Sequence, residues 1–239
     1  RIDATERCAE LEERIAELQR LETLGEADLD APVERLREPI EAYNEGVRED
    51  YRSFAAEASA RDLLALFERA AATPLVDARE PPADLLEYVR EYPAGADPVP
   101  DLLEYADYSA SKLDHYVDDP GALRARVATH RTYLERLGPE PFTLAWPPVE
   151  GGELRYRTRE LLSIVDTFAG EATVVDLRAV RDLPRSEEYG RLREAATAIA
   201  ELDDDQRERV AAGEVARDLE RARARRDAIE DALESAPAL

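Results

Sequence analysis

The chain has 239 residues and carries 55 acidic side chains against 32 basic ones, a formal charge of −23 at pH 7. Its apolar content of 44% suffices for a core, so the composition excludes a disordered chain and permits one large or two small helical domains. No long apolar run or signal-peptide pattern is present, which argues against a membrane protein and favours a cytoplasmic one.

The acidic charge has two interpretations. Acids are spread along every segment, and Lys112 is the only lysine beside many arginines. This pattern favours the proteome-wide adaptation of an extreme halophile, because molar salt screens the repulsion between carboxylates. The alternative is a surface that mimics nucleic acid or binds basic partners.

The first predicted helix covers residues 1–24 and ends at Gly25. Its apolar residues alternate four and three positions apart, as in a coiled-coil seam: Ala4, Cys8, Leu11, Ile15 and Leu18. Because Cys8 is the only cysteine, an intrachain disulfide is excluded, and its place in the seam predicts a small buried thiol.

A second helix is predicted over residues 33–54, where apolar residues recur three or four positions apart on one stripe. They are Val33, Leu36, Ile40, Tyr43, Val47, Tyr51 and Phe54. Pro39 lies inside this helix and predicts a kink or break. The short connection to the first helix favours an antiparallel hairpin.

Residues 59–137 read as a cluster of shorter helices. One spans 59–72, two similar helix openings begin near Pro81 and Pro98, and another helix opens at Pro120.

The segment 139–180 is predicted to be a small α+β insert. Residues 142–146 and 154–158 are short, aromatic and alternating, and they read as two strands of a β-hairpin. A Pro-Pro…Gly-Gly turn at residues 147–152 would join them, and Val174-Val175 is a possible third strand.

From residue 185 onward the chain is again helical, with an expected interruption at Gly213. The last helix carries a second heptad-spaced seam: Val215, Leu219, Ala222, Ile229 and Leu233. We therefore expect the first, second and last helices to form one antiparallel bundle from residues 1–58 and 185–236. A dimeric coiled coil would use the same pattern.

The predicted fold class is thus mainly α: an antiparallel helical hairpin or bundle with coiled-coil-like seams, plus a β-hairpin-containing insert near 140–180.

No motif for catalysis, phosphate binding or metal binding is present. His115 and His130 lack a His or Cys three or four positions away, so no zinc site is predicted, and His130 is expected to be a hydrogen-bonded core residue. We predict no catalytic residue, no metal and no cofactor.

Two groups of arginines are candidate contacts for a partner or a phosphate. Arg155, Arg157 and Arg159 alternate around Tyr156 and would share one face of a strand. The second group lies on the last helix, near Arg217: Arg221, Arg223, Arg225 and Arg226. The alternative for both groups is ion pairing with neighbouring acids.

The favoured function is a non-catalytic interaction or scaffolding protein of an extreme halophile, which acts through helix–helix contacts with a protein partner or a second copy. The alternative is a nucleic-acid-associated accessory factor that uses the arginines at 155–159 and 217–226. An enzyme with an unusual carboxylate site is a third class, for which the sequence supplies no specific residues.

Overall fold

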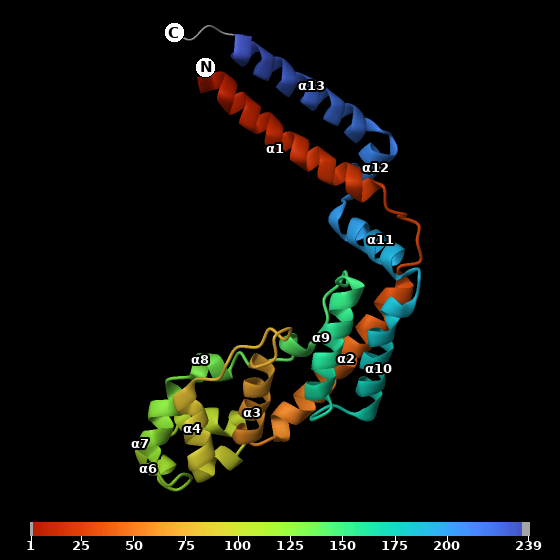
Figure 1. The fold of residues 1–239 in the computed structure, drawn as a ribbon. Coiled ribbons are helices and arrows are strands. Elements are labelled where there is room, and N and C mark those ends of the chain that lie inside the picture. Colours follow the sequence, from red (N-terminus) through yellow and green to blue (C-terminus); the bar gives the residue numbers. More distant parts are fainter. Residues whose placement is uncertain (1, 236–239) are drawn as a thin grey trace. The chain divides into compact units, whose positions relative to one another are not determined.

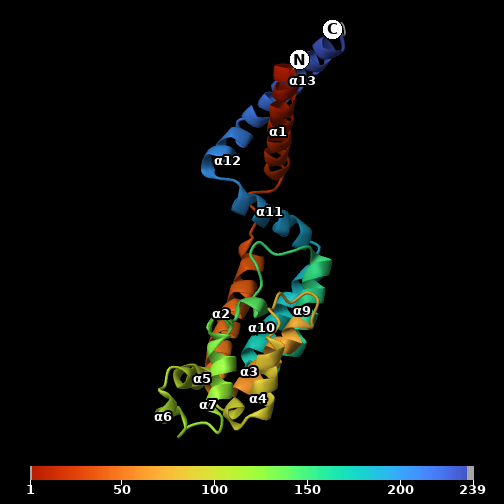
Figure 2. The ribbon, with the colours of Figure 1, turned by 90° about the vertical axis from the view of Figure 1, so that its left-hand side faces the viewer.

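The computed structural model describes residues 2–235, without the side chains of residues 2–4, 110 and 234. The chain divides into two compact units, residues 1–34 with 187–239 and residues 35–186. Figures 1 and 2 show the helices of each unit. In the described part of the chain, no helix has the length and hydrophobicity that crossing a bilayer requires.

The first unit is built on two long antiparallel helices, α1 (Ile2–Gly25) and α13 (Glu214–Ser235), which lie side by side in both views (Figures 1 and 2). Helices α11 (Tyr189–Glu201) and α12 (Asp204–Ala211) also contact α1. The shared core consists of apolar side chains from α1, α11 and α13, and from Leu202 just after α11: Ile15, Leu18, Leu21, Ala198, Leu202, Val215, Leu219 and Ala222.

The start of α12 and the turn after it each have a local cause. Asp203 and Gln206 form a capping box that starts α12. Gly213 takes a φ of 67°, which interrupts the helical path between α12 and α13 as predicted. The chain can then reverse and lay α13 along α1.

The two predicted seams meet, with unequal coverage along their length. Ile15 and Leu18 are buried, as are Val215 and Leu219. Nearer the ends of the chain, the seam residues Cys8, Leu11, Ile229 and Leu233 are only half-buried. The side chain of Ala4, the first seam position, lies outside the described residues. Cys8 is therefore a free thiol at a half-buried position.

The second unit begins with α2 (Glu34–Glu57), which continues through Pro39 without a break. In this division α2 belongs to residues 35–186, whereas the sequence grouped it with α1 and α13. Most of the predicted stripe on α2 is buried, including Ile40, Tyr43 and Val47. The α-helices that follow α2 are α3 (Ala60–Ala71), α4 (Ala83–Glu91), α5 (Val99–Ala106), α6 (Ala110–Leu113), α7 (Pro120–Leu123), α8 (Arg131–Leu134), α9 (Gly151–Val165) and α10 (Glu171–Asp182). Short segments between them form 3-10 helices, labelled η1 (Pro93–Ala96), η3 (Glu140–Phe142) and η4 (Leu183–Arg185), and one π-helical turn, labelled η2 (Arg124–Ala128).

The β-hairpin predicted near 140–180 is wrong. The described residues contain no strand, and their only β pairing is an isolated bridge between Ser59 and Pro98. Gly151 and Gly152 begin α9 and do not form a turn, because the Glu150 side chain caps the first turn of the helix. Val174 and Val175 lie in helix α10.

The extended residues before α9 pair with α2 and not with a strand. The Leu144 N–H donates to Asn44 Oδ1 at 2.8 Å, and Asn44 Nδ2 donates to the Leu144 carbonyl at 2.8 Å. The Tyr43 hydroxyl donates to the Phe142 carbonyl at 2.5 Å. These side chains supply the backbone partners that a second strand would otherwise provide.

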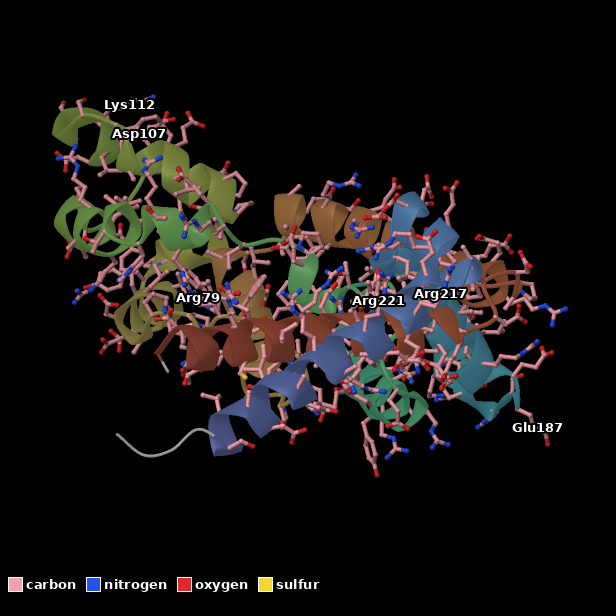
Figure 3. All side chains as sticks on the ribbon, turned by 90° about the horizontal axis from the view of Figure 1, so that it is seen from above. Arg79, Asp107, Lys112, Glu187, Arg217 and Arg221 are labelled. Atoms are coloured by element: carbon pink, nitrogen blue, oxygen red, sulfur yellow. The ribbon has the colours of Figure 1, made fainter. Side chains whose placement is uncertain are left out.

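Charged side chains cover the helices of both units and are not gathered on a single element (Figure 3). Many of the arginines form ion pairs, for example Arg20 with Glu201 in the first unit and Arg90 with Glu68 in the second. Exposed pairs of this kind each contribute at most about 1 kcal/mol.

Candidate functional site

The second unit contains an open groove of about 630 Å³ between α2 and α3, closed at one end by the connection from α9 to α10. We call it the α2–α3 groove. Residues from all three segments line it: Asp50, Ser53, Phe54, Glu57, Ala58, Asp62, Ala65, Leu66, Arg69, Thr167 and Phe168. Because α2 and α3 are consecutive, a short turn suffices to set the two walls of the groove.

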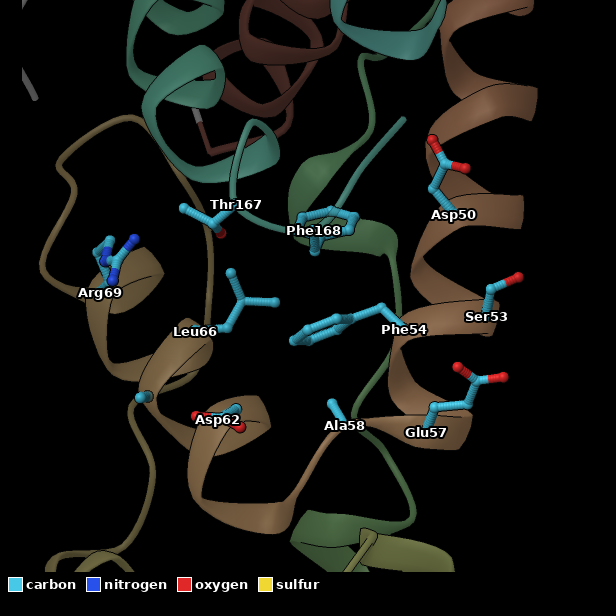
Figure 4. Close-up of a pocket in the computed structure, with 11 residues that line it drawn as sticks. Asp50, Ser53, Phe54, Glu57, Ala58, Asp62, Leu66, Arg69, Thr167 and Phe168 are labelled. Carbon is cyan, nitrogen blue, oxygen red and sulfur yellow. The ribbon is translucent and has the colours of Figure 1, made fainter. Parts of the chain in front are cut away.

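The floor of the groove is apolar. Figure 4 shows Phe54, Leu66 and Phe168 converging on the space between the helices. The rings of Phe54 and Phe168 are 5.7 Å apart, and Phe168 also packs on buried Phe142 at 5.3 Å. Phe54 and Phe168 are nevertheless half-exposed, whereas Phe142 and Phe67 are buried. The groove therefore leaves aromatic surface uncovered.

The rim of the groove is mainly acidic, with Asp50, Glu57 and Asp62 against the single cation Arg69 among its lining residues. Two of these acids also hold the local structure. Asp50 accepts hydrogen bonds from the Gly170 N–H at 2.9 Å and the Thr173 hydroxyl at 2.6 Å. These bonds fix the start of α10 and, through it, the position of Phe168.

Of the other two rim acids, Asp62 also holds the local structure, whereas Glu57 does not. Asp62 accepts a hydrogen bond from the Ser59 hydroxyl at 2.7 Å, at the N-cap of α3. Glu57 is exposed, and its carboxylate forms no hydrogen bond or ion pair with another described residue. In Figure 4 it extends from the last turn of α2. Glu57 is thus the rim carboxylate available to a partner.

This combination of an aromatic floor and an acidic rim suits an apolar side chain flanked by cationic groups. No group of three His, Cys, Asp or Glu side chains within the described residues is placed to hold a metal ion.

Arg155, Arg157 and Arg159 do not share one face, because they lie on helix α9 and not on a strand. Successive residues of a helix are rotated by about 100°, so Arg155 and Arg159 lie on one side and Arg157 on another. Arg157 is half-buried and donates to the Thr143 carbonyl at 3.3 Å. Its guanidinium therefore supports the extended segment and is less available to a binding partner than those of Arg155 and Arg159.

Tyr156, between them, is 62% exposed, and the Arg159 guanidinium lies 5.6 Å from the centre of its ring. Arg155 and Arg159 are both exposed, and neither forms an ion pair within the part of the chain that the structure describes. We call Arg155, Tyr156 and Arg159 the α9 patch.

The arginines of α13 divide into two kinds. Arg221 pairs with Asp218, and Arg226 pairs with Asp227 at 2.6 Å and with Glu230 at 3.7 Å. Hydrogen bonding to Asp227 raises the pKa of Arg226. For these two residues the geometry matches the alternative of ion pairing with neighbouring acids.

Two other α13 arginines, Arg223 and Arg225, are exposed and make no ion pair with any described residue. Arg217 instead donates to the carbonyls of Gly213 and Ala212 at the start of α13. Figure 3 labels Arg217 and Arg221 on this helix. The α13 cluster thus presents few free cations.

Both histidines lie outside regular α-helix. His130 Nε2 is 2.8 Å from Asp84 Oδ1, so the predicted hydrogen-bonded histidine is present, though half-buried. The hydrogen bond from His130 lowers the pKa of Asp84, and Arg126, 3.2 Å from the same carboxylate, acts in the same direction. His115 is exposed in the turn after α6.

Comparison with known families now places the chain. It belongs to the family described as Domain of unknown function (DUF7118), which matches residues 1–233. No curated protein and no solved structure matches it. The groove, the α9 patch, α1 and all but the last two residues of α13 fall within the matched residues of this DUF7118 chain.

Sequence reasoning did not find the groove in this DUF7118 chain. Phe54 is only the last residue of the predicted helical stripe, and Phe168 lies within the predicted α+β insert. No local pattern links these two phenylalanines. Their proximity depends on a contact between residues more than 100 positions apart.

Proposed function

We propose that this protein is a non-catalytic interaction or scaffolding protein that binds a protein partner through the α1–α13 pair. The observation that supports the proposal is the half-buried end of the seam, where Cys8, Leu11, Ile229 and Leu233 remain partly open. Two helices cover only one stripe of each other, so a further helix is needed to enclose such residues.

Burial of these residues would supply part of the free energy that a helical partner needs to bind. Complete burial of one Leu or Ile side chain is favourable by about 1.5–3 kcal/mol, so completing the burial of a half-covered one contributes roughly 1 kcal/mol. Leu11, Ile229 and Leu233 together would contribute about 3 kcal/mol. An amphipathic helix that docks along them is the partner this surface favours.

Comparative affinity capture tests the proposal. A Leu11→Asp/Ile229→Asp variant should lose the proteins that wild type captures at native salt, because it places two charges in the seam. An Ala9→Asp/Ala228→Asp variant changes charge equally at exposed positions and is the matched control. Equal capture of the same proteins by wild type and by both variants would contradict a role for the seam.

The α9 patch supports a second candidate, a nucleic-acid-associated accessory factor. An exposed tyrosine stacks on bases, and the free guanidinium groups of Arg155 and Arg159 bind phosphate oxygens. Fluorescence anisotropy with labelled DNA and RNA, measured over a range of salt, tests it. Binding should weaken with salt and fall further in an Arg155→Ala/Arg159→Ala variant. No binding by wild type, or no loss in the variant, would remove this candidate.

A further inference from the structure

The second unit carries two surface features that complement each other. The α2–α3 groove has an apolar floor of Phe54, Leu66 and Phe168 beneath a mainly acidic rim. The α9 patch has one exposed aromatic ring, that of Tyr156, between two arginines without ion-pair partners among the described residues. The groove is concave and mainly acidic, whereas the α9 patch presents an exposed ring and positive charge.

The groove and the patch of one chain do not satisfy each other. Tyr156 lies in the second turn of α9. Val165, where the helix ends and the connection to Phe168 begins, lies nine positions further along the chain. At 1.5 Å per residue, this places Tyr156 about 14 Å away along the helix axis. A tyrosine side chain does not span that distance, so the partner must come from another molecule.

We infer that the α2–α3 groove binds the α9 patch of a second copy of this chain. Tyr156 of one copy packs on Phe54 and Phe168 of the other, and its ring covers their half-exposed surfaces. Arg155 and Arg159 then lie at the acidic rim, where Glu57 carries no other partner among the described residues. Tyr and Arg are also the residue types most enriched among the dominant contacts of protein interfaces.

The charge arrangement favours this occupant. The rim supplies Asp50, Glu57 and Asp62, and the α9 patch supplies two guanidinium groups, so the contact brings opposite charges together in a chain with a net charge of −23. A two-fold arrangement would form two such contacts at once, whereas any other arrangement would form a head-to-tail series. Either arrangement needs about 1,000 Å² of buried surface to be stable.

The first test is the association state of the full chain, measured by sedimentation velocity over a wide concentration range at low and at molar salt. Wild type should associate reversibly. Tyr156→Ser and Arg159→Glu should each weaken association about tenfold or more, because they remove the ring or reverse one charge. A monomer at every concentration and both salts would overturn the inference.

Charge exchange separates this contact from association through α1 and α13. Glu57→Arg should weaken association as Arg159→Glu does, and the Glu57→Arg/Arg159→Glu double variant should recover most of it, since the pair is re-formed with reversed signs. Arg223→Glu, on exposed α13, makes the same charge change outside the contact and should have little effect. If the double variant is as weak as the sum of its parts, Glu57 and Arg159 do not meet.

Disulfide trapping tests proximity directly. In a Cys8→Ser background, a mixture of the Ala58→Cys and Tyr156→Cys variants should form a mixed disulfide dimer, because position 58 lines the groove. Replacing the second partner by Ala172→Cys, which is exposed on α10, gives the matched control. Equal cross-linking in both mixtures would overturn the inference. Circular dichroism shows whether each variant retains its helices.

Discussion

Replacing Asn44 by Ala tests how the extended segment before α9 is held in place. Asn44 is 8% exposed, and its amide satisfies both backbone groups of Leu144, each at 2.8 Å. Leu144 is itself 5% exposed, so truncation leaves a buried N–H and a buried C=O without a partner. Each unsatisfied group costs about 1–3 kcal/mol, so the two together predict a loss of about 2–6 kcal/mol in the free energy of unfolding.

Urea and thermal unfolding followed by circular dichroism measure this loss. For a unit of this size, each kcal/mol lowers Tm by about 2–4 °C, so Asn44→Ala should lower Tm by about 4–24 °C. Tyr43→Phe removes one donor to the Phe142 carbonyl and is the matched comparison, with a cost of about 1–2 kcal/mol. If Asn44→Ala costs less than Tyr43→Phe, the paired amide does not hold this segment.

Three further predictions concern packing, pH and backbone conformation. Phe142→Ala should cost about 3–5 kcal/mol in unfolding free energy, because its ring is fully buried, and Phe168→Ala should cost less because its ring is half-exposed; equal costs in urea would contradict the partly open floor. The pKa of Asp84 is lowered below its ordinary 3.8 in the fold, so its contribution to stability is present above that pH and is lost as pH falls through the lower folded value. Acid unfolding of Asp84→Asn should accordingly depend less on pH below about 4, and an unchanged pH dependence would contradict the hydrogen bond with His130. Gly213→Ala should cost about 1–2 kcal/mol in thermal unfolding because φ is 67° there, and a neutral effect would contradict that conformation.

Several features of the fold follow from local sequence alone. The heptad spacing on α1 and α13 predicts which faces meet, since the positions of side chains around a helix depend only on residue number. Ser59 caps α3 and Gly213 separates α12 from α13, as short-range rules for helix ends predict. The buried stripe of α2 was likewise readable, because it is periodic over six turns.

Other features depend on residues distant in the chain, and local pattern could not settle them. Residues 142–146 have the composition of a strand, yet their backbone pairs with Tyr43 and Asn44, about 100 positions away, and the following residues are then free to form α9. The α2–α3 groove exists because Asp50 holds the start of α10 and brings Phe168 beside Phe54. Propensity and periodicity describe neighbours along the chain, whereas a surface that binds is made by neighbours in space.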